Sequence, residues 1–282
     1  MIARMETTGR PATRLDGQAL ARAVDGSLFD LFRSMRALPG AELVERDTLA
    51  LHHAFPGNPM FKGVWAPRLA PDEADEAIVE ALGWHAARGA PFAFWWTGPG
   101  ATPGDLGGRL EAHGLVAWER DAPGMAAELD ALDWSARARV PDGYREDVAR
   151  TPGDLEAFAT VFTRSFGVPV WAAQGWIDAT LALGIGRAPW AMVVGRLGGE
   201  PVATAIVSPG AGVASVFGVG VVPEARGRGL GASITLAGYE LLREQGYRYG
   251  VLFATPEGLP VYERLGFRQV EAAISRWLWR RP

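Results

Sequence analysis

The residues best suited to chemistry lie in the hexapeptide Arg226–Gly231, where three glycines are interleaved with two arginines. Glycines let backbone N–H groups approach a ligand closely, and arginine side chains hold phosphate oxygens. Upstream, the apolar run 216–222 predicts a buried strand that ends before Pro223. Downstream, apolar residues recur at helical spacing over 230–241, and Gly246 stands where a C-terminal cap is expected. A strand, a glycine turn and a helix N-terminus together predict an anion site that suits a pyrophosphate.

Two common phosphate-binding motifs, the P-loop and the dinucleotide fingerprint, do not fully match this turn. No Gly-Lys-Ser/Thr follows it, and the only lysine of the chain is Lys62, so the turn is not a P-loop. The spacing Gly227-x-Gly229-x-x-Ala232 matches a loose dinucleotide fingerprint, but residues 250–254 lack the acid expected about 20 positions on. The hexapeptide alone leaves open a plain glycine turn with solvated arginines.

A second motif follows about 30 residues later. Residues 247–254 predict a strand and residues 258–264 a short helix, which ends in Tyr262-Glu263-Arg264-Leu265-Gly266-Phe267. The two motifs, in this order, resemble those of the GCN5-related N-acetyltransferase (GNAT) family over residues 144–282. That family carries Arg/Gln-x-x-Gly-x-Gly/Ala and then Tyr-x-x-x-Gly-Phe. The matching residues here are Arg226, Gly229, Gly231, Tyr262, Gly266 and Phe267.

The resemblance implies a sheet whose fourth and fifth strands part to admit acetyl-coenzyme A. The pantetheine arm would pair with the backbone of Val219 and Val221, on either side of Gly220. The pyrophosphate would bind the amides of the glycine turn, near both arginines. The family often has Asn seven residues before its Tyr, whereas this chain has Thr255 followed by Pro256, so the shape of that loop departs from the pattern. The expected coenzyme-binding residues are Val219, Gly220, Val221, Arg226, Gly227, Arg228, Gly229, Leu230, Gly231, Ala232 and Thr255.

The resemblance also implies that Tyr262 is the general acid that protonates the leaving thiolate. A phenol with a pKa near 10 donates to a more acidic thiolate mainly when the two are hydrogen-bonded in a dry site. A tyrosine that only packs on an amphipathic helix is the alternative.

Composition limits the remaining classes of function. The chain has 282 residues, 48% of them hydrophobic, which is enough for two domains with real cores. A net charge of −4 does not favour nucleic acid as a partner. Without cysteine, the chain has no disulfide, no thiolate metal site and no acyl-thioester enzyme intermediate; no metal is expected. Residues 1–6 lack the apolar core of a signal peptide, and no apolar run is long enough for a membrane span, so a cytoplasmic protein without a membrane partner is expected.

The second half lacks residue types that an acyl-enzyme mechanism would need, which indicates direct transfer of the acetyl group. The four histidines (His52, His53, His85 and His113) all lie in the first half, and no Gly-x-Ser-x-Gly elbow occurs. We therefore favour a mechanism in which an amine attacks the thioester in a ternary complex. The base that takes the amine proton is either a carboxylate such as Asp178 or water.

The first half reads as a degenerate copy of the second. A strand at 92–96 and a helix at 103–113 precede Gly114, and aligning this glycine with Gly266 puts Leu110 where Tyr262 stands. In the same alignment, residues 124–129 at the end of the first half correspond to the final strand near 275–279. A strand at 61–67 and a helix at 74–87 flank a segment that has three acids and no glycine loop, which would repel a phosphate. An unrelated α+β cap is the alternative.

These patterns predict an α/β fold with a mixed sheet, made of two tandem acetyltransferase-like domains, 1–136 and 144–282. Each would have a central, mostly antiparallel sheet flanked by helices, with a splayed strand pair. The turn-rich segment 137–143 sets the boundary. The second domain would open with a strand at 144–148, helices at 154–166 and 171–183, and a hairpin of 190–196 with 201–207.

The resemblance implies that the two helices after this first strand wall the acceptor site. Asp178 could meet an ammonium group, while the aromatic residues fit a packing role equally well. The expected substrate-binding residues are Phe166, Trp171, Trp176, Asp178 and Trp190.

The predicted function is acetylation of a primary amine on a small molecule or peptide. The tandem layout with an inactive first half resembles that of mycothiol synthase. The alternative class is a coenzyme A-binding sensor or scaffold without turnover, which the intact Tyr262 and glycine turn disfavour. The sequence leaves open a monomer or a homodimer, and acetyl or another short acyl group as the donor.

Overall fold

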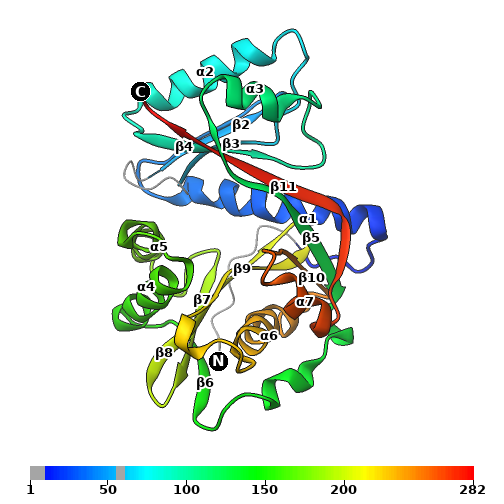
Figure 1. The fold of residues 1–282 in the computed structure, drawn as a ribbon, viewed down its shortest axis with the longest axis vertical. Coiled ribbons are helices and arrows are strands. Elements are labelled where there is room, and N and C mark those ends of the chain that lie inside the picture. Colours follow the sequence, from blue (N-terminus) through cyan, green and yellow to red (C-terminus); the bar gives the residue numbers. More distant parts are fainter. Residues whose placement is uncertain (1–9, 55–60) are drawn as a thin grey trace.

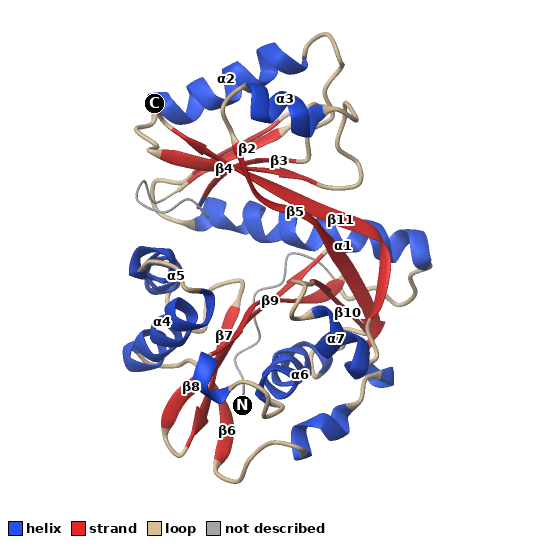
Figure 2. Cartoon of the chain, viewed as in Figure 1, coloured by secondary structure: helices blue, strands red, loops and turns tan. Residues whose placement is uncertain are grey.

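The computed structural model describes residues 10–54 and 61–282, so the prediction for the N-terminal residues 1–6 lies outside the described part. Within it, the strands form one eleven-stranded mixed sheet in the order β1-β2-β3-β4-β11-β5-β10-β9-β8-β7-β6 (Figures 1 and 2). The strands are β1 (Glu42–Glu45), β2 (Ala50–His53), β3 (Lys62–Trp65), β4 (Phe92–Thr97), β5 (Val116–Glu128), β6 (Tyr144–Val148), β7 (Ala191–Leu197), β8 (Glu200–Gly210), β9 (Val213–Val221), β10 (Tyr249–Phe253) and β11 (Arg268–Arg280). The helices are α1 (Gly17–Ser34), α2 (Ala74–Ala87), α3 (Leu106–Ala112), α4 (Pro152–Phe166), α5 (Val170–Leu183), α6 (Leu230–Arg243) and α7 (Leu259–Leu265).

The two halves of the chain exchange their last strands. β11 pairs antiparallel with β4 of the first half, where Trp279 lies opposite Ala93. In return β5, the last strand of the first half, pairs with β10, where Gly124 lies opposite Phe253. β5 and β11 also pair with each other at the centre of the sheet, where Figure 1 shows them running side by side between the upper and lower halves. The segment 137–143 therefore separates the halves in sequence but not in the sheet.

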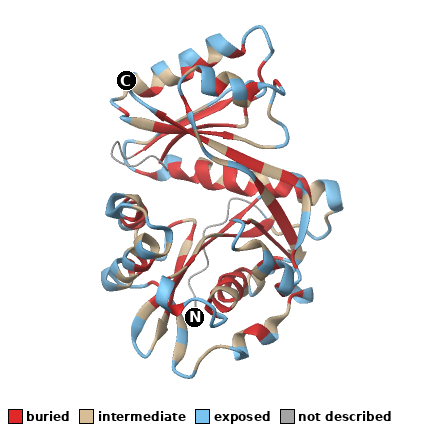
Figure 3. Cartoon of the chain, in the orientation of Figure 1, coloured by how far each residue is buried: buried red, intermediate tan, exposed pale blue. Residues whose placement is uncertain are grey.

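Helices cover both faces of the second half's sheet. α6 and α7 pack on one face, where Leu236 and Tyr239 are buried. α4 and α5 pack on the other, in a core that also takes in Phe32 of α1 and Phe94 of β4. This second core continues across both halves of the molecule, and the buried stripe of α1 that lines it is visible in Figure 3.

Local signals explain where the key helices begin. The Thr151 side chain accepts from the Asp154 backbone N–H, and the Asp154 side chain accepts from the Thr151 N–H, so the two form a capping box at the start of α4. Thr151 is therefore the N-cap of α4. The predicted strand 144–148 and helix 74–87 agree with β6 and α2 residue for residue.

The predicted fold class, a mixed sheet flanked by helices in two tandem units, is confirmed. No helix in the described part is long and apolar enough to cross a membrane.

Candidate coenzyme and acceptor site

The slot expected for the coenzyme lies between β9 and β10. These strands are parallel and pair only at Ala214 with Gly250 and at Ser215 with Val251. Beyond Ser215, β9 continues to Val221 without pairing to β10, while β10 stays paired with β5 along its other edge. The two strands thus share one end and part at their carboxyl ends, as predicted.

Two glycines let α4 rest directly on β9. The β8–β9 register shifts between the pairs Ile206–Phe217 and Thr204–Gly220, so β9 carries an extra residue there. Gly218 adopts a φ of 56° at this bulge, a conformation that favours glycine. A Cβ on Gly220 would lie 2.8 Å from Cβ of Ser165 in the last turn of α4.

Only part of the Val221 backbone is left for a ligand. Val222 N–H donates to Val202 O at 3.0 Å, and residues of an antiparallel strand alternate in direction, so Val221 N–H and C=O point away from β8, toward the slot. The Val221 carbonyl already accepts from Nε of Arg226 at 3.1 Å. The Val221 N–H points into the slot and is placed to donate to a ligand carbonyl.

The glycine turn presents uncapped amides at the start of a long helix. Gly227 and Gly229 have φ values of 74° and 80°, and Gly229 is the N-cap of α6 without a side-chain capping bond. A Cβ on Gly227 would meet nothing within 4 Å, and one on Gly231 only Val221 Cγ2 at 3.8 Å. The first-turn N–H groups of α6, from Leu230 to Ala232, thus stand next to open space. An anion fits this place because these N–H groups lack intrahelical partners and the helix dipole is positive here.

The two arginines of the turn differ. Arg226 donates from Nη2 to Ser165 O at 2.8 Å and from Nε to Val221 O, so its guanidinium binds two backbone carbonyls. Arg228 is exposed, and within the described residues its side chain makes no hydrogen bond or ion pair. Arg228 therefore has its whole guanidinium available to a phosphate, whereas Arg226 already uses two of its five N–H donors.

Tyr262 is buried between α6 and α7. Its ring contacts Phe267, with centroids 6.2 Å apart, and leaves no room for a side chain on Gly258. Burial raises the pKa of the Tyr262 phenol to about 12, and a hydrogen bond with the Thr235 side chain opposes this rise. The phenol therefore keeps its proton at neutral pH, as a general acid must. Thr255 lies in the turn before α7, where its hydroxyl accepts from Gly258 N–H at 3.2 Å.

The residues expected at the acceptor wall divide by exposure. Trp176 and Trp190 are buried edge-to-face, and Trp190 Nε1 donates to Thr180 Oγ1 at 2.9 Å, which favours packing. Phe166 and Trp171 are 41% and 44% exposed. Asp178 is exposed on α5.

Trp171 and Asp178 each contact another side chain. Trp171 stacks on Phe92 of the first half, with ring centroids 5.6 Å apart. Asp178 accepts from Nε2 of Gln174 at 2.8 Å. Sequence motifs gave no signal for Ser165 or Thr235, because neither belongs to a recognisable pattern.

The corresponding slot in the first half is closed. β3 and β4 pair at Gly63 with Phe94 and at Val64 with Trp95, and they are joined again beyond this point by a bridge between Arg68 and Thr102. Thr102 N–H donates to Pro67 O at 3.1 Å and Leu69 N–H to Thr102 O at 3.2 Å. Leu110, the counterpart of Tyr262, is fully buried.

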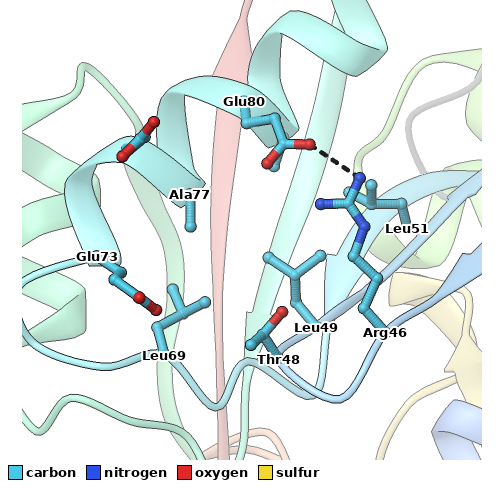
Figure 4. Close-up of a pocket in the computed structure, with 10 residues that line it drawn as sticks. Arg46, Thr48, Leu49, Leu51, Leu69, Glu73, Ala77 and Glu80 are labelled. Atoms are coloured by element: carbon cyan, nitrogen blue, oxygen red, sulfur yellow. Dashed lines mark ion pairs between the residues drawn. The ribbon is translucent and has the colours of Figure 1, made fainter.

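A cavity of about 320 Å³ lies beside α2, at the opposite end of the molecule from α6 (Figures 1 and 4). Its rim carries Glu73, Glu76 and Glu80, and the last of these pairs with Arg46 at 2.8 Å. Carboxylates repel phosphates, so this cavity does not suit a coenzyme. No group of three or more His, Cys, Asp or Glu side chains that could hold a metal ion occurs in the described residues.

Comparison with known proteins agrees with this geometry. Residues 157–267 match the model of the Acetyltransferase (GNAT) family. This segment forms a GNAT domain. The GNAT match covers the glycine turn, α6, β10 and α7.

Curated relatives include two mycothiol acetyltransferases. The protein from Saccharomonospora viridis is 29% identical over 178 residues, which cover 54% of each chain. The protein from Geodermatophilus obscurus is 30% identical over 196 residues, which cover 63% of this chain and 61% of that one. The chain thus spans little more than half the length of these relatives.

Solved structures show the same fold. A GCN5-related N-acetyltransferase from Kribbella flavida has a TM-score of 0.69 and 22% identity, and the match covers 92% of this chain and 94% of that one. A tandem GNAT protein from the clavulanic acid biosynthesis pathway has a TM-score of 0.56 and 18% identity, with 96% and 97% coverage.

Proposed function

We propose that this protein is an acetyl-coenzyme A-dependent N-acetyltransferase with one coenzyme site, in residues 144–282. The observation that carries the proposal is the parting of β9 and β10 beside the uncapped amides of α6, together with a Tyr262 phenol that is buried against α6. The first half, 1–136, has a closed counterpart of this slot and would serve as a non-catalytic domain.

Acetyl-coenzyme A, when bound, supplies an activated acetyl thioester. The turn amides and Arg228 would hold its phosphates, and Val221 N–H would orient its pantetheine arm. Tyr262 holds a proton at Oη, ready for the departing thiolate. The amine proton would pass to Asp178, which lies exposed on α5, or to water. Transfer would be direct, without an acyl-enzyme, because the chain has no cysteine and no serine elbow.

The proposed acceptor is a primary amine on a small molecule or peptide. The mycothiol acetyltransferases among the relatives make a mycothiol-type acceptor the first one to test. A coenzyme A-binding sensor without turnover is the other class, and the buried phenol with its proton argues against it.

The test combines two measurements on the full chain. Calorimetry with acetyl-coenzyme A should give saturable binding at one site per chain. Thiol release should then appear with at least one member of an amine panel that includes a mycothiol-type acceptor, small amines and peptide N-termini. Binding without thiol release for every amine would favour the sensor, and failure to bind would refute the site. Comparing acetyl- with longer acyl-coenzyme A would identify the donor.

A further inference from the structure

Arg226 connects two elements that belong to different parts of the proposed site. Its Nε donates to Val221 O on the slot strand at 3.1 Å, and its Nη2 donates to Ser165 O at 2.8 Å. Ser165 lies in the last turn of α4, whose carbonyls have no partners within the helix. One planar guanidinium thus bridges the coenzyme slot and the end of α4.

Other contacts reinforce this junction. Arg164 of α4 forms an ion pair with Glu224, two residues before Arg226. Gly220 of β9 lets Ser165 approach so closely that a Cβ there would clash at 2.8 Å. The end of α4 is therefore joined to the slot by a guanidinium bridge, an ion pair and direct packing.

The end of α4 leads straight into the proposed acceptor wall. Gly167, with a φ of 62°, ends the helix, and α5 begins at Val170. Phe166 and Trp171, on either side of this connection, are the two candidate acceptor-site aromatics that are exposed. A change at Ser165 would be transmitted to both.

We propose that Arg226 is a positioning residue that couples the coenzyme slot to the acceptor wall, while Arg228 and the turn amides bind the phosphates. This inference rests on the proposed function. A ligand that fixes the turn would also fix the backbone of Arg226, and through its guanidinium the last turn of α4. Bound coenzyme would then hold the wall that the acceptor meets more firmly in place.

The test compares Arg226→Met with Arg228→Met, two equal losses of charge two residues apart. Arg226→Met should raise the KM of the acceptor about tenfold and change the Kd of coenzyme A less than about threefold. Arg228→Met should do the reverse, weakening coenzyme A about tenfold as one charge-assisted contact is lost, with the acceptor KM unchanged. If Arg226→Met instead weakens coenzyme A as Arg228→Met does and leaves the acceptor KM unchanged, Arg226 is a phosphate ligand and the proposal fails.

A second readout does not depend on turnover. In the wild type and in Arg228→Met, coenzyme A at saturation should slow amide hydrogen exchange in residues 163–171. In Arg226→Met this protection should be lost although coenzyme A still binds. Equal protection in both variants would overturn the coupling, even if no acceptor is found. Failure of coenzyme A to bind the wild type would refute the proposed function instead.

Discussion

The Thr235 side chain of α6 lies beside the Tyr262 phenol of α7 and lowers the pKa of this phenol, against the larger effect of burial. Thr235 is itself held by a 2.7 Å bond from its hydroxyl to Gly231 O. The phenol is therefore positioned by the same helix whose first turn is expected to hold the coenzyme phosphates. This link ties the proposed general acid to the coenzyme site.

Replacing Tyr262 by Phe should slow transfer about 100-fold or more, because proton donation by a positioned acid contributes on that scale. Binding of acetyl-coenzyme A, measured by calorimetry, should change little. Tyr239→Phe is the matched control, because that hydroxyl donates to Val251 O at 2.7 Å and has no role in the proposed chemistry. It should cost about 1 kcal/mol of stability and leave kcat intact. Equal kcat in Tyr262→Phe and wild type would remove Tyr262 from the mechanism.

The pH dependence of turnover should reflect the raised pKa of Tyr262. An acid acts in its protonated form, and burial raises the pKa of this phenol to about 12, so it stays protonated from pH 7 to pH 10. Between pH 7 and pH 10, the wild-type kcat should therefore show no alkaline decline caused by Tyr262. A decline caused by Tyr262 would be one that is present in the wild type and absent in Tyr262→Phe. Such a decline would indicate a phenol that is wetter and more acidic than the structure implies.

Substituting Gly229 should damage coenzyme binding as well as stability. Gly229→Ala forces an alanine to a φ of 80° and puts its Cβ 3.0 Å from Arg139 O, at the N-terminus of α6. Gly246→Ala is the control, since Gly246 has a φ of 93° with nothing within 4 Å and follows the other end of the same helix. Both should cost about 1–2 kcal/mol in thermal or denaturant unfolding. Only Gly229→Ala should weaken acetyl-coenzyme A in calorimetry, and equal affinities would place the ligand elsewhere.

The sequence predicted those parts of the site that consecutive residues build. The glycine turn and the Tyr262 helix are local, so their residue types and spacing are readable without the fold. The role of Arg226 could not be predicted in this way, because a guanidinium suits a phosphate and a backbone carbonyl equally well. Only the distance to Ser165, 61 positions earlier, decides between them.

The sequence also did not predict that the two halves exchange their last strands. Apolar residues in 275–279 indicate a buried strand, but side-chain alternation does not say which strand lies beside it. The predicted mirror relation between this strand and 124–129 fits either arrangement. α1 was missed for a related reason, since its buried stripe packs on strands of both halves and no short motif marks it.

The exchange predicts that the two halves unfold together. Trp277 of β11 is buried in the core formed by α2, α3 and β4, where its ring lies 2.9 Å from the position of a Cβ on Gly107. Trp277→Ala should cost about 3–5 kcal/mol and lower the temperature of a single calorimetric transition. The exposed Trp118 of β5 gives a control, and Trp118→Ala should cost about 1 kcal/mol or less. Two separate transitions, with only one of them shifted by Trp277→Ala, would contradict the coupling.

The only lysine of the chain should reduce stability at neutral pH. Lys62 is fully buried, with Nζ 5.4 Å from the centroid of the Phe92 ring, and burial lowers the pKa of its ammonium from 10.5 to about 7. Between these values the unfolded chain binds a proton that the folded protein releases, so the free energy of unfolding rises with pH from about 7 to 10.5. Lys62→Met removes the titrating group, so the stability of the variant relative to the wild type should fall by on the order of 2–4 kcal/mol as the pH rises from 7 to 10.5. Thermal unfolding across this range would measure it. Arg145→Met, at an exposed position, is the control and should show no such trend. A Lys62→Met protein less stable than wild type at pH 7 would mean that the ammonium contributes more to the fold than its burial costs.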